Sequence, residues 1–108
     1  MKPNELRIGN YVYNNLEIIK LHKKDLIYLF TSDNMHFANP IPLTEEWLLK
    51  FRFRTEESSC FELDNIQINT SRELVWINIK RKYNIEIGMP NYVHQLQNLY
   101  FALTNTEL

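Results

Sequence analysis

The side chains best suited to metal binding or nucleophilic catalysis stand far apart in this sequence. They are the single cysteine, Cys60, and the histidines His22, His36 and His94. Zinc sites in short domains use pairs of such residues roughly two to five positions apart, a spacing that does not occur here. A Cys60–His94 nucleophilic pair would require a strand and a helix to pack together, and nothing around Cys60 resembles a nucleophile elbow. The sequence therefore predicts no metal site and no catalytic residue, and Cys60 is expected to be a small buried side chain.

Nucleotide chemistry and acid–base chemistry also lack the patterns they require. Gly9 and Gly88 are the only glycines, too few for the glycine-rich loop that holds phosphate groups. The carboxylate pairs Glu45–Glu46 and Glu56–Glu57 stand where a helix N-terminus and a solvent-exposed loop explain them. We expect no cofactor and no enzymatic activity.

Three clusters of basic residues give the strongest nucleic-acid signal. The middle cluster alternates with Phe51 and Phe53, a pattern that could hold a phosphate backbone and stack a base. Lysines also commonly cover exposed turns and protect strand edges, so both interpretations stay open. The candidates for binding RNA or single-stranded DNA are Lys23, Lys24, Lys50, Arg52, Arg54, Lys80, Arg81 and Lys82.

A second candidate surface lies on a helix predicted over 91–104. At about 100° per residue, most of its apolar side chains share one face, namely Tyr92, Val93, Leu96, Leu99, Tyr100 and Leu103. Phe101 points the opposite way, among His94, Gln97 and Asn98. These four residues are either a second packing layer against the N-terminal strands or a partner-binding surface with an aromatic anchor.

The elements that must position these residues begin with a β-rich block. Strands are expected over 6–13, 16–22 and 25–30, with a turn or bulge at Gly9–Asn10 and a hairpin tip at Lys23–Lys24. A short connecting helix is expected near 44–51, because Thr44 suits the N-cap and the next two residues are acidic. Trp47, Leu48 and Phe51 would share one face of that helix.

A second β-rich block follows a polar segment at 52–59 that is expected to be a loop. Its predicted strands, at 60–63, 65–69, 73–80 and 83–87, would form a meander. Val75 and Ile77 alternate with Leu74 and Trp76, so that strand is expected to be covered on both sides. The predicted fold class is α+β, an antiparallel sheet of about six or seven strands in two blocks with the C-terminal helix packed on it.

The overall composition indicates one globular domain spanning 1–108. The chain has 108 residues, is 44% hydrophobic and carries a formal net charge of −1, so no global field draws it to nucleic acid or to a membrane. A single cysteine excludes an intrachain disulfide. No apolar run reaches the roughly 20 residues of a membrane span, so we expect a cytoplasmic protein without a membrane partner.

Three segments carry a resemblance to a known group of proteins. They are KPNELRIGNYV at the start, PIPLTEEWLLKF in the middle and YVHQLQNLYFALTNTEL at the end. Together they resemble small uncharacterised proteins carried by phages and prophages of Bacteroidetes bacteria. The chain departs from that pattern at Arg52, where the group tends to glycine, and at Asn105–Thr106, where it tends to Gly-Glu, so a glycine C-cap is missing from the last helix.

The resemblance implies a mobile-element origin and a non-enzymatic protein that engages host machinery. The implied partner is a host protein or ribonucleoprotein, and the most concrete form is an inhibitor of bacterial antiviral defence, such as an anti-CRISPR protein acting on an effector or its guide RNA. Two alternatives remain: an accessory protein that binds RNA or single-stranded DNA, and a sponge for a small nucleotide signal. The resemblance implies the cytoplasm of a bacterial host as the location.

Overall fold

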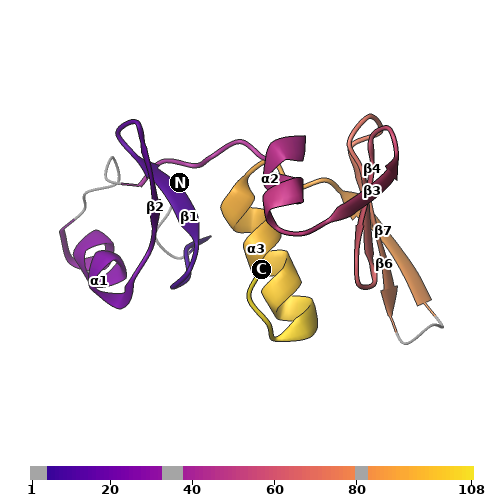
Figure 1. Ribbon diagram of the computed structural model, residues 1–108. Helices are drawn as coiled ribbons and strands as arrows, with labels where there is room; N and C mark the ends of the chain where they lie inside the picture. The colour runs from indigo at the N-terminus through magenta and orange to yellow at the C-terminus, as the bar shows by residue number, and fades with distance from the viewer. Residues whose placement is uncertain (1–4, 33–37, 80–82) are drawn as a thin grey trace. The chain divides into compact units, whose positions relative to one another are not determined.

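The chain forms an α+β structure with antiparallel sheets, which confirms the predicted class. The computed structural model describes residues 5–32, 38–79 and 83–108 (Figure 1). These residues contain a two-stranded sheet, a five-stranded sheet and three helices. The chain divides into two compact units: unit 1 is Met1–Pro42 with Asn91–Leu108, and unit 2 is Leu43–Pro90. A single domain over 1–108 stays a prediction.

Unit 1 contains a short hairpin of β1 (Tyr11–Asn14) and β2 (Glu17–Lys20). The turn between them holds Asn15 at a φ of 58°, a left-handed conformation that asparagine tolerates better than most residues. The strand expected over 6–13 is therefore shorter, because the predicted Gly9–Asn10 turn interrupts it. Gly9 adopts a φ of 95°, which glycine reaches without a steric penalty.

A helix, α1 (Lys23–Ser32), replaces the strand predicted over 25–30. The prediction of a hairpin tip at Lys23–Lys24 is also wrong, since these lysines form the first turn of α1. The carboxylate of Asp25 accepts a hydrogen bond from the backbone N–H of His22 at 2.8 Å, which satisfies a group at the helix start. Leu29 is buried and Leu26 is half-buried, three residues apart on one helical face. This face packs with the core of unit 1, whose buried members include Leu6, Val12, Leu21 and Ala38.

The predicted C-terminal helix is present as α3 (Val93–Thr104), in contact with β1. Val93, Leu96 and Tyr100 are buried, in agreement with the predicted apolar face. Leu103, by contrast, is 39% exposed. The helix ends at Asn105, whose φ of 56° gives the left-handed cap that glycine usually provides.

Unit 2 begins with α2 (Glu45–Lys50), the predicted connecting helix. Thr44 occupies the N-cap position in extended conformation, although its side chain makes no capping hydrogen bond. Trp47, Leu48 and Phe51 are all buried, as their spacing predicts.

The rest of unit 2 is a five-stranded antiparallel meander. Its strands follow chain order and are β3 (Arg54–Glu57), β4 (Cys60–Leu63), β5 (Ile66–Asn69), β6 (Leu74–Ile79) and β7 (Tyr83–Gly88). The predicted meander is confirmed. Residues with positive φ make three of the turns: Ser59 at 69°, Asp64 at 53° and Glu73 at 56°. One sheet face is buried through Phe61, Ile66, Ile68, Val75 and Ile77.

The strand β3 lies in the segment predicted as a loop. All four of its residues are exposed, so it shows none of the apolar alternation by which strands are recognised in sequence. Among the strands that the structure describes, it is an edge strand paired with β4, and its register shifts between Arg54 and Glu57. Short, charged and irregular edges of this kind resist pairing with other chains.

Candidate functional site

The polar stripe of α3 faces inward within unit 1. His94 and Gln97 are each 1% exposed, while Asn98 and Phe101 are half-buried. Of the two alternatives, the packing layer is the one that the structure shows, and the expectation of an exposed stripe is wrong for His94 and Gln97. The reason is that the N-terminal segment presents main-chain groups that need partners. A partner-binding role for the four residues stays a prediction.

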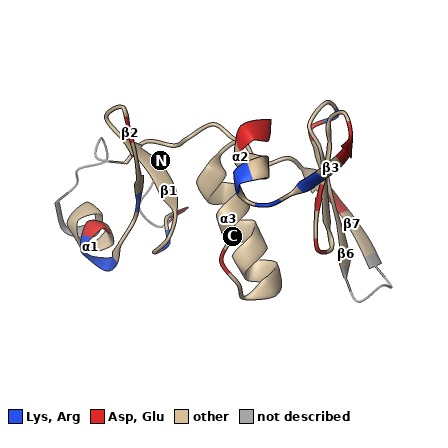
Figure 2. Ribbon diagram, viewed as in Figure 1, with Lys and Arg blue, Asp and Glu red and all other residues tan. Residues whose placement is uncertain are grey.

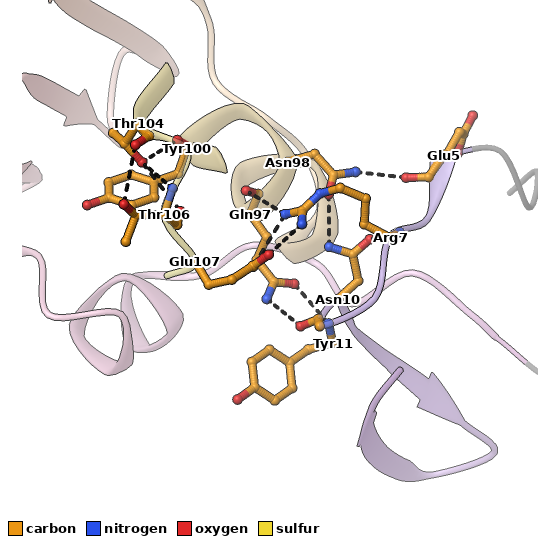
Figure 3. A network of polar contacts seen from close by, with 11 residues as sticks. Glu5, Arg7, Asn10, Tyr11, Gln97, Asn98, Tyr100, Thr104, Thr106 and Glu107 are labelled. Atoms are coloured by element: carbon orange, nitrogen blue, oxygen red, sulfur yellow. Dashed lines mark hydrogen bonds and ion pairs between the residues drawn. The ribbon is translucent and has the colours of Figure 1, made fainter. Parts of the chain in front are cut away.

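The amides of Gln97 and Asn98 supply those partners (Figure 3). The side-chain oxygen of Gln97 accepts the backbone N–H of Tyr11 at 2.8 Å, and its nitrogen donates to the carbonyl of Gly9 at 3.0 Å. Asn98 donates to the carbonyl of Glu5 at 2.8 Å. The two amides therefore attach α3 to the segment that leads into β1.

Arg7 completes this network around Phe101. Its Nε donates to the side-chain oxygen of Asn98 at 2.9 Å, and a terminal nitrogen donates to the carbonyl of Gln97 at 3.2 Å. The guanidinium carbon lies 4.2 Å from the centre of the Phe101 ring, within cation–π distance. Glu107 pairs with the same guanidinium. Phe101, which points away from the apolar face of α3, thus packs against the guanidinium of Arg7 within unit 1.

His94 is a buried histidine whose ring nitrogens find no hydrogen-bond partner in the part of the chain that the structure describes. Burial lowers its pKa from the ordinary value of 6.5, and the carboxylate of Glu5, 4.0 Å from Nε2, opposes that shift. The ring stacks with Tyr92 at a centroid distance of 6.0 Å. Among residues 5–32, 38–79 and 83–108, no cluster of histidine, cysteine and carboxylate residues could hold a metal ion.

The predicted nucleic-acid residues that the structure describes belong to two different units. Lys23 and Lys24 belong to unit 1, and the predicted cluster of Lys80, Arg81 and Lys82 lies outside the described residues. In unit 2, the ammonium of Lys50 lies 4.8 Å from the Trp47 ring centre, and Arg52 and Arg54 are exposed.

The expected base-stacking phenylalanines are buried. Phe51 is 7% exposed and Phe53 is 3% exposed. The proposed alternation of phosphate grip and base stacking is therefore wrong for this segment, because a buried ring cannot stack on a base.

A different surface stands out in unit 2: the sheet face opposite the buried one, here called the outer face. Strand pairing aligns one residue from each strand across it, a set called the central row. Trp76 in this row is half-buried, whereas its neighbours are exposed. The prediction that the strand over 73–80 is covered on both sides is therefore wrong for this face. The central row is Arg54, Glu62, Gln67, Trp76 and Glu86.

Two hollows adjoin the central row and share Glu62, Gln67 and Trp76 as lining residues. One has a volume of about 280 Å³ and reaches toward Cys60 and Asn69. The other, of about 210 Å³, is lined by side-chain amides and is the more polar. The indole of Trp76 donates from Nε1 to the carboxylate of Glu86 at 2.9 Å, which fixes the ring between the hollows.

The outer face carries more carboxylates than cations among its described residues; Figure 2 colours the acidic and basic positions along the ribbon. Among the described residues of the hollows and the central row, five carboxylates face one guanidinium, that of Arg54. The carboxylates belong to Glu56, Glu57, Glu62, Asp64 and Glu86. The site therefore offers negative charge, amides and the aromatic ring of Trp76.

Cys60 is half-buried in the larger hollow rather than fully buried. Its sulfur accepts a weak hydrogen bond from the Asn69 amide at 3.7 Å. Cys60 and His94 belong to different units.

Sequence reasoning missed the outer face and the role of Arg7. The alternation of Leu74 and Trp76 with Val75 was the available signal, but it indicates two faces without telling which is covered. Arg7 and Glu107 lie 100 residues apart in sequence, and no local pattern connects residues at such a separation.

Comparison with known proteins gave no match: a scan of protein-family models, a search of curated proteins and a search of solved structures each found none. Over the described residues, no helix combines the length and apolar character needed to cross a membrane.

Proposed function

We propose that this protein is a non-enzymatic binding protein that engages host machinery through the outer face of the five-stranded sheet. The observation that carries the proposal is the half-buried Trp76, held by Glu86 between two adjoining hollows. Aromatic side chains surrounded by polar groups are the typical anchors of protein interfaces.

A protein partner is favoured over a nucleic acid. Phe51 and Phe53 are buried and cannot stack bases. Arg54, the one basic residue of the central row, lies opposite Glu62 in the strand pairing. Carboxylates around a cation repel the phosphates that the cation would otherwise attract.

The most concrete form of this function is inhibition of bacterial antiviral defence, as by an anti-CRISPR protein that acts on an effector or its guide RNA. Support for this form comes from the resemblance of the sequence to proteins of phages and prophages. A small sheet with one recognition face suits a protein that acts by occupying a surface of its target.

The test is affinity capture from a Bacteroidetes lysate treated with nuclease. The wild-type protein should retain a partner protein that resists nuclease treatment. The outer-face variants Gln67→Ala and Glu86→Gln should fail to retain it. Leu49→Ala, the control, changes a 53% exposed side chain of α2 in the same unit and should retain it. A partner that disappears with nuclease would contradict the preference for a protein partner, and a partner that both outer-face variants retain would contradict the outer face as the binding surface.

A further inference from the structure

In the central row, Glu62 and Glu86 stand on either side of Gln67 and Trp76, and these two carboxylates are here called the acidic ends. Arg54 lies beyond Glu62. Glu86 lies beside Trp76 on the neighbouring strand, and Glu62 lies two strands away on the other side of Gln67. Adjacent strands are about 4.8 Å apart, so Glu62 and Glu86, three strand steps from each other, are roughly 14 Å apart along the row.

The surroundings of the two acidic ends differ. The Glu62 end also has Glu56 and Glu57 in the same hollow, together with the guanidinium of Arg54. At the other end, the Glu86 carboxylate accepts the indole N–H of Trp76. A cation that stacks on the indole would therefore lie within reach of Glu86.

We infer that the outer face binds an extended segment of a partner protein that carries two arginines about four residues apart. An extended chain advances about 3.3 Å per residue, so roughly four residues span the distance between the acidic ends. Side chains at i and i+4 of an extended segment point to the same side. This inference rests on the proposed function and specifies the chemistry of the partner.

Arginine fits this face better than lysine does. Its planar guanidinium can stack on the indole of Trp76 and at the same time donate to a carboxylate, whereas an ammonium is a compact, strongly hydrated point charge. The exposed amide of Gln67 lies in the central row, and those of Asn78 and Asn84 lie in the more polar hollow beside it. They are suited to hydrogen bonds with the main chain of an extended segment.

Replacing Arg54 distinguishes an arginine-bearing partner from a nucleic-acid ligand. Removing this cation increases the negative charge of the face. An arginine-bearing segment should then bind more tightly, by about two- to threefold for an exposed charge. A nucleic-acid ligand should bind more weakly, because one phosphate contact is lost.

The experiment titrates the isotope-labelled full chain with a capped peptide, Gly-Arg-Gly-Ser-Gly-Arg-Gly, and follows its NMR spectrum. The indole N–H of Trp76 and the amides of β4 to β7 should shift. Glu62→Gln and Glu86→Gln should each weaken binding about threefold, Trp76→Ala about two- to fivefold, and added salt should weaken it further. Glu86→Gln retains an acceptor for the indole, so a change in affinity reports the charge rather than the fold.

The matched probes are the same peptide with glutamates in place of the arginines, and a thymidine oligonucleotide. Neither should shift the Trp76 indole. The inference is overturned if the oligonucleotide binds and Arg54→Gln weakens it, or if the arginine peptide binds equally well to Glu62→Gln and Glu86→Gln. Loss of the captured partner in Gln67→Ala but not in the charge variants would keep the proposed function and reject an arginine-bearing partner. Peptide binding without any captured partner would support the surface chemistry and reject the proposed function.

Discussion

Gln97 makes the hydrogen bonds to Gly9 and Tyr11 that a neighbouring strand could make. Its amide both accepts from the N–H of Tyr11 and donates to the carbonyl of Gly9, the pair of main-chain groups that a neighbouring strand would otherwise satisfy. With 1% of its surface exposed, it shields both bonds from water. Glutamine is suited to this position because its single side chain carries a donor and an acceptor.

Replacing Gln97 with leucine should lower the free energy of unfolding by about 3 kcal/mol. The substitution keeps the volume approximately but removes the amide that bonds the half-buried N–H of Tyr11 and the buried carbonyl of Gly9, each lost bond costing roughly 1–3 kcal/mol. Chemical denaturation measures the change. The control is Gln67→Leu, an exposed position on the outer face, where a change within about 0.5 kcal/mol is expected. Equal losses in the two variants would show that the Gln97 bonds contribute nothing.

His94 should make the stability of unit 1 depend on pH. Burial lowers the pKa of His94 below 6.5, against the smaller opposing effect of Glu5. Between the lowered pKa and 6.5, the unfolded chain binds more protons than the folded one, so the free energy of unfolding decreases as the pH falls through this range. The free energy of unfolding is therefore highest above pH 6.5 and becomes smaller as the pH falls below that value.

Denaturation at a series of pH values tests this expectation. His94→Leu should flatten the dependence of stability on pH below 6.5, whereas Gln67→Leu, which removes no titratable group, should keep the wild-type dependence. An identical pH profile for wild type and His94→Leu would contradict the assignment.

At the scale of the elements, the end of α2 shows how a backbone requirement overrides residue preference. The N–H of Phe53 donates to the carbonyl of Leu48 at 3.0 Å, and the N–H of Arg52 donates to that of Leu49 at 3.0 Å. These are the two bonds of a Schellman motif, which places Arg52 at the position normally taken by glycine. Arg52 accordingly has a φ of 72°.

Arg52→Gly should therefore raise the free energy of unfolding by about 1 kcal/mol. A left-handed conformation costs a residue with a Cβ atom roughly 1–2 kcal/mol, and glycine avoids this cost. The larger conformational entropy of glycine in the unfolded chain offsets part of the gain. Arg52→Ala is the control. It removes the same charge but keeps the Cβ atom, so it should give no comparable gain. A similar gain from both variants would attribute the effect to charge, and thermal or chemical denaturation would distinguish them.

The elements that sequence reasoning found are those with long-range alternation or a clear helical face. The strands β1, β2 and β4 to β7, together with α2 and α3, lie where such patterns predict them, with β1 and β2 shorter than expected. The segment 25–30 was assigned to a strand because a short run of apolar residues suits both structures. The carboxylate of Asp25, three residues after His22, was the signal for a helix start. The strand β3 has no apolar residue, so only its pairing with β4 reveals it.

The candidate site was predictable only in part. The polar face of α3 followed from its periodicity, but its partners Arg7 and Gly9 come from the other end of the chain. The outer face depends on which side of β6 is left uncovered, and that is decided by packing rather than by the local sequence.

On the scale of the whole molecule, the chain leaves unit 1 after Pro42 and returns to it at Asn91. Unit 2 is therefore one continuous segment, whereas unit 1 is completed only when the last residues of the chain have joined the first. The contribution of α3 is large: complete burial of Val93, Leu96 and Tyr100 would supply about 5–9 kcal/mol as an upper bound. That is comparable with the total stability of about 5–15 kcal/mol that domains show.

A chain cut after Gly88 should consequently fail to form unit 1 and should be insoluble or molten. It loses the buried side chains of α3 and leaves Gly9 and Tyr11 without Gln97. Near-ultraviolet circular dichroism should show lost tertiary packing, and a hydrophobic dye should bind. The control is a chain cut after Thr106, which removes Glu107 and Leu108. The exposed pair of Glu107 with Arg7 is expected to contribute no more than about 1 kcal/mol. A protein ending at Gly88 that stays monomeric with an unchanged Tm would show that unit 1 does not depend on α3. Losing several kcal/mol of burial free energy would otherwise lower the Tm of a domain of ordinary stability.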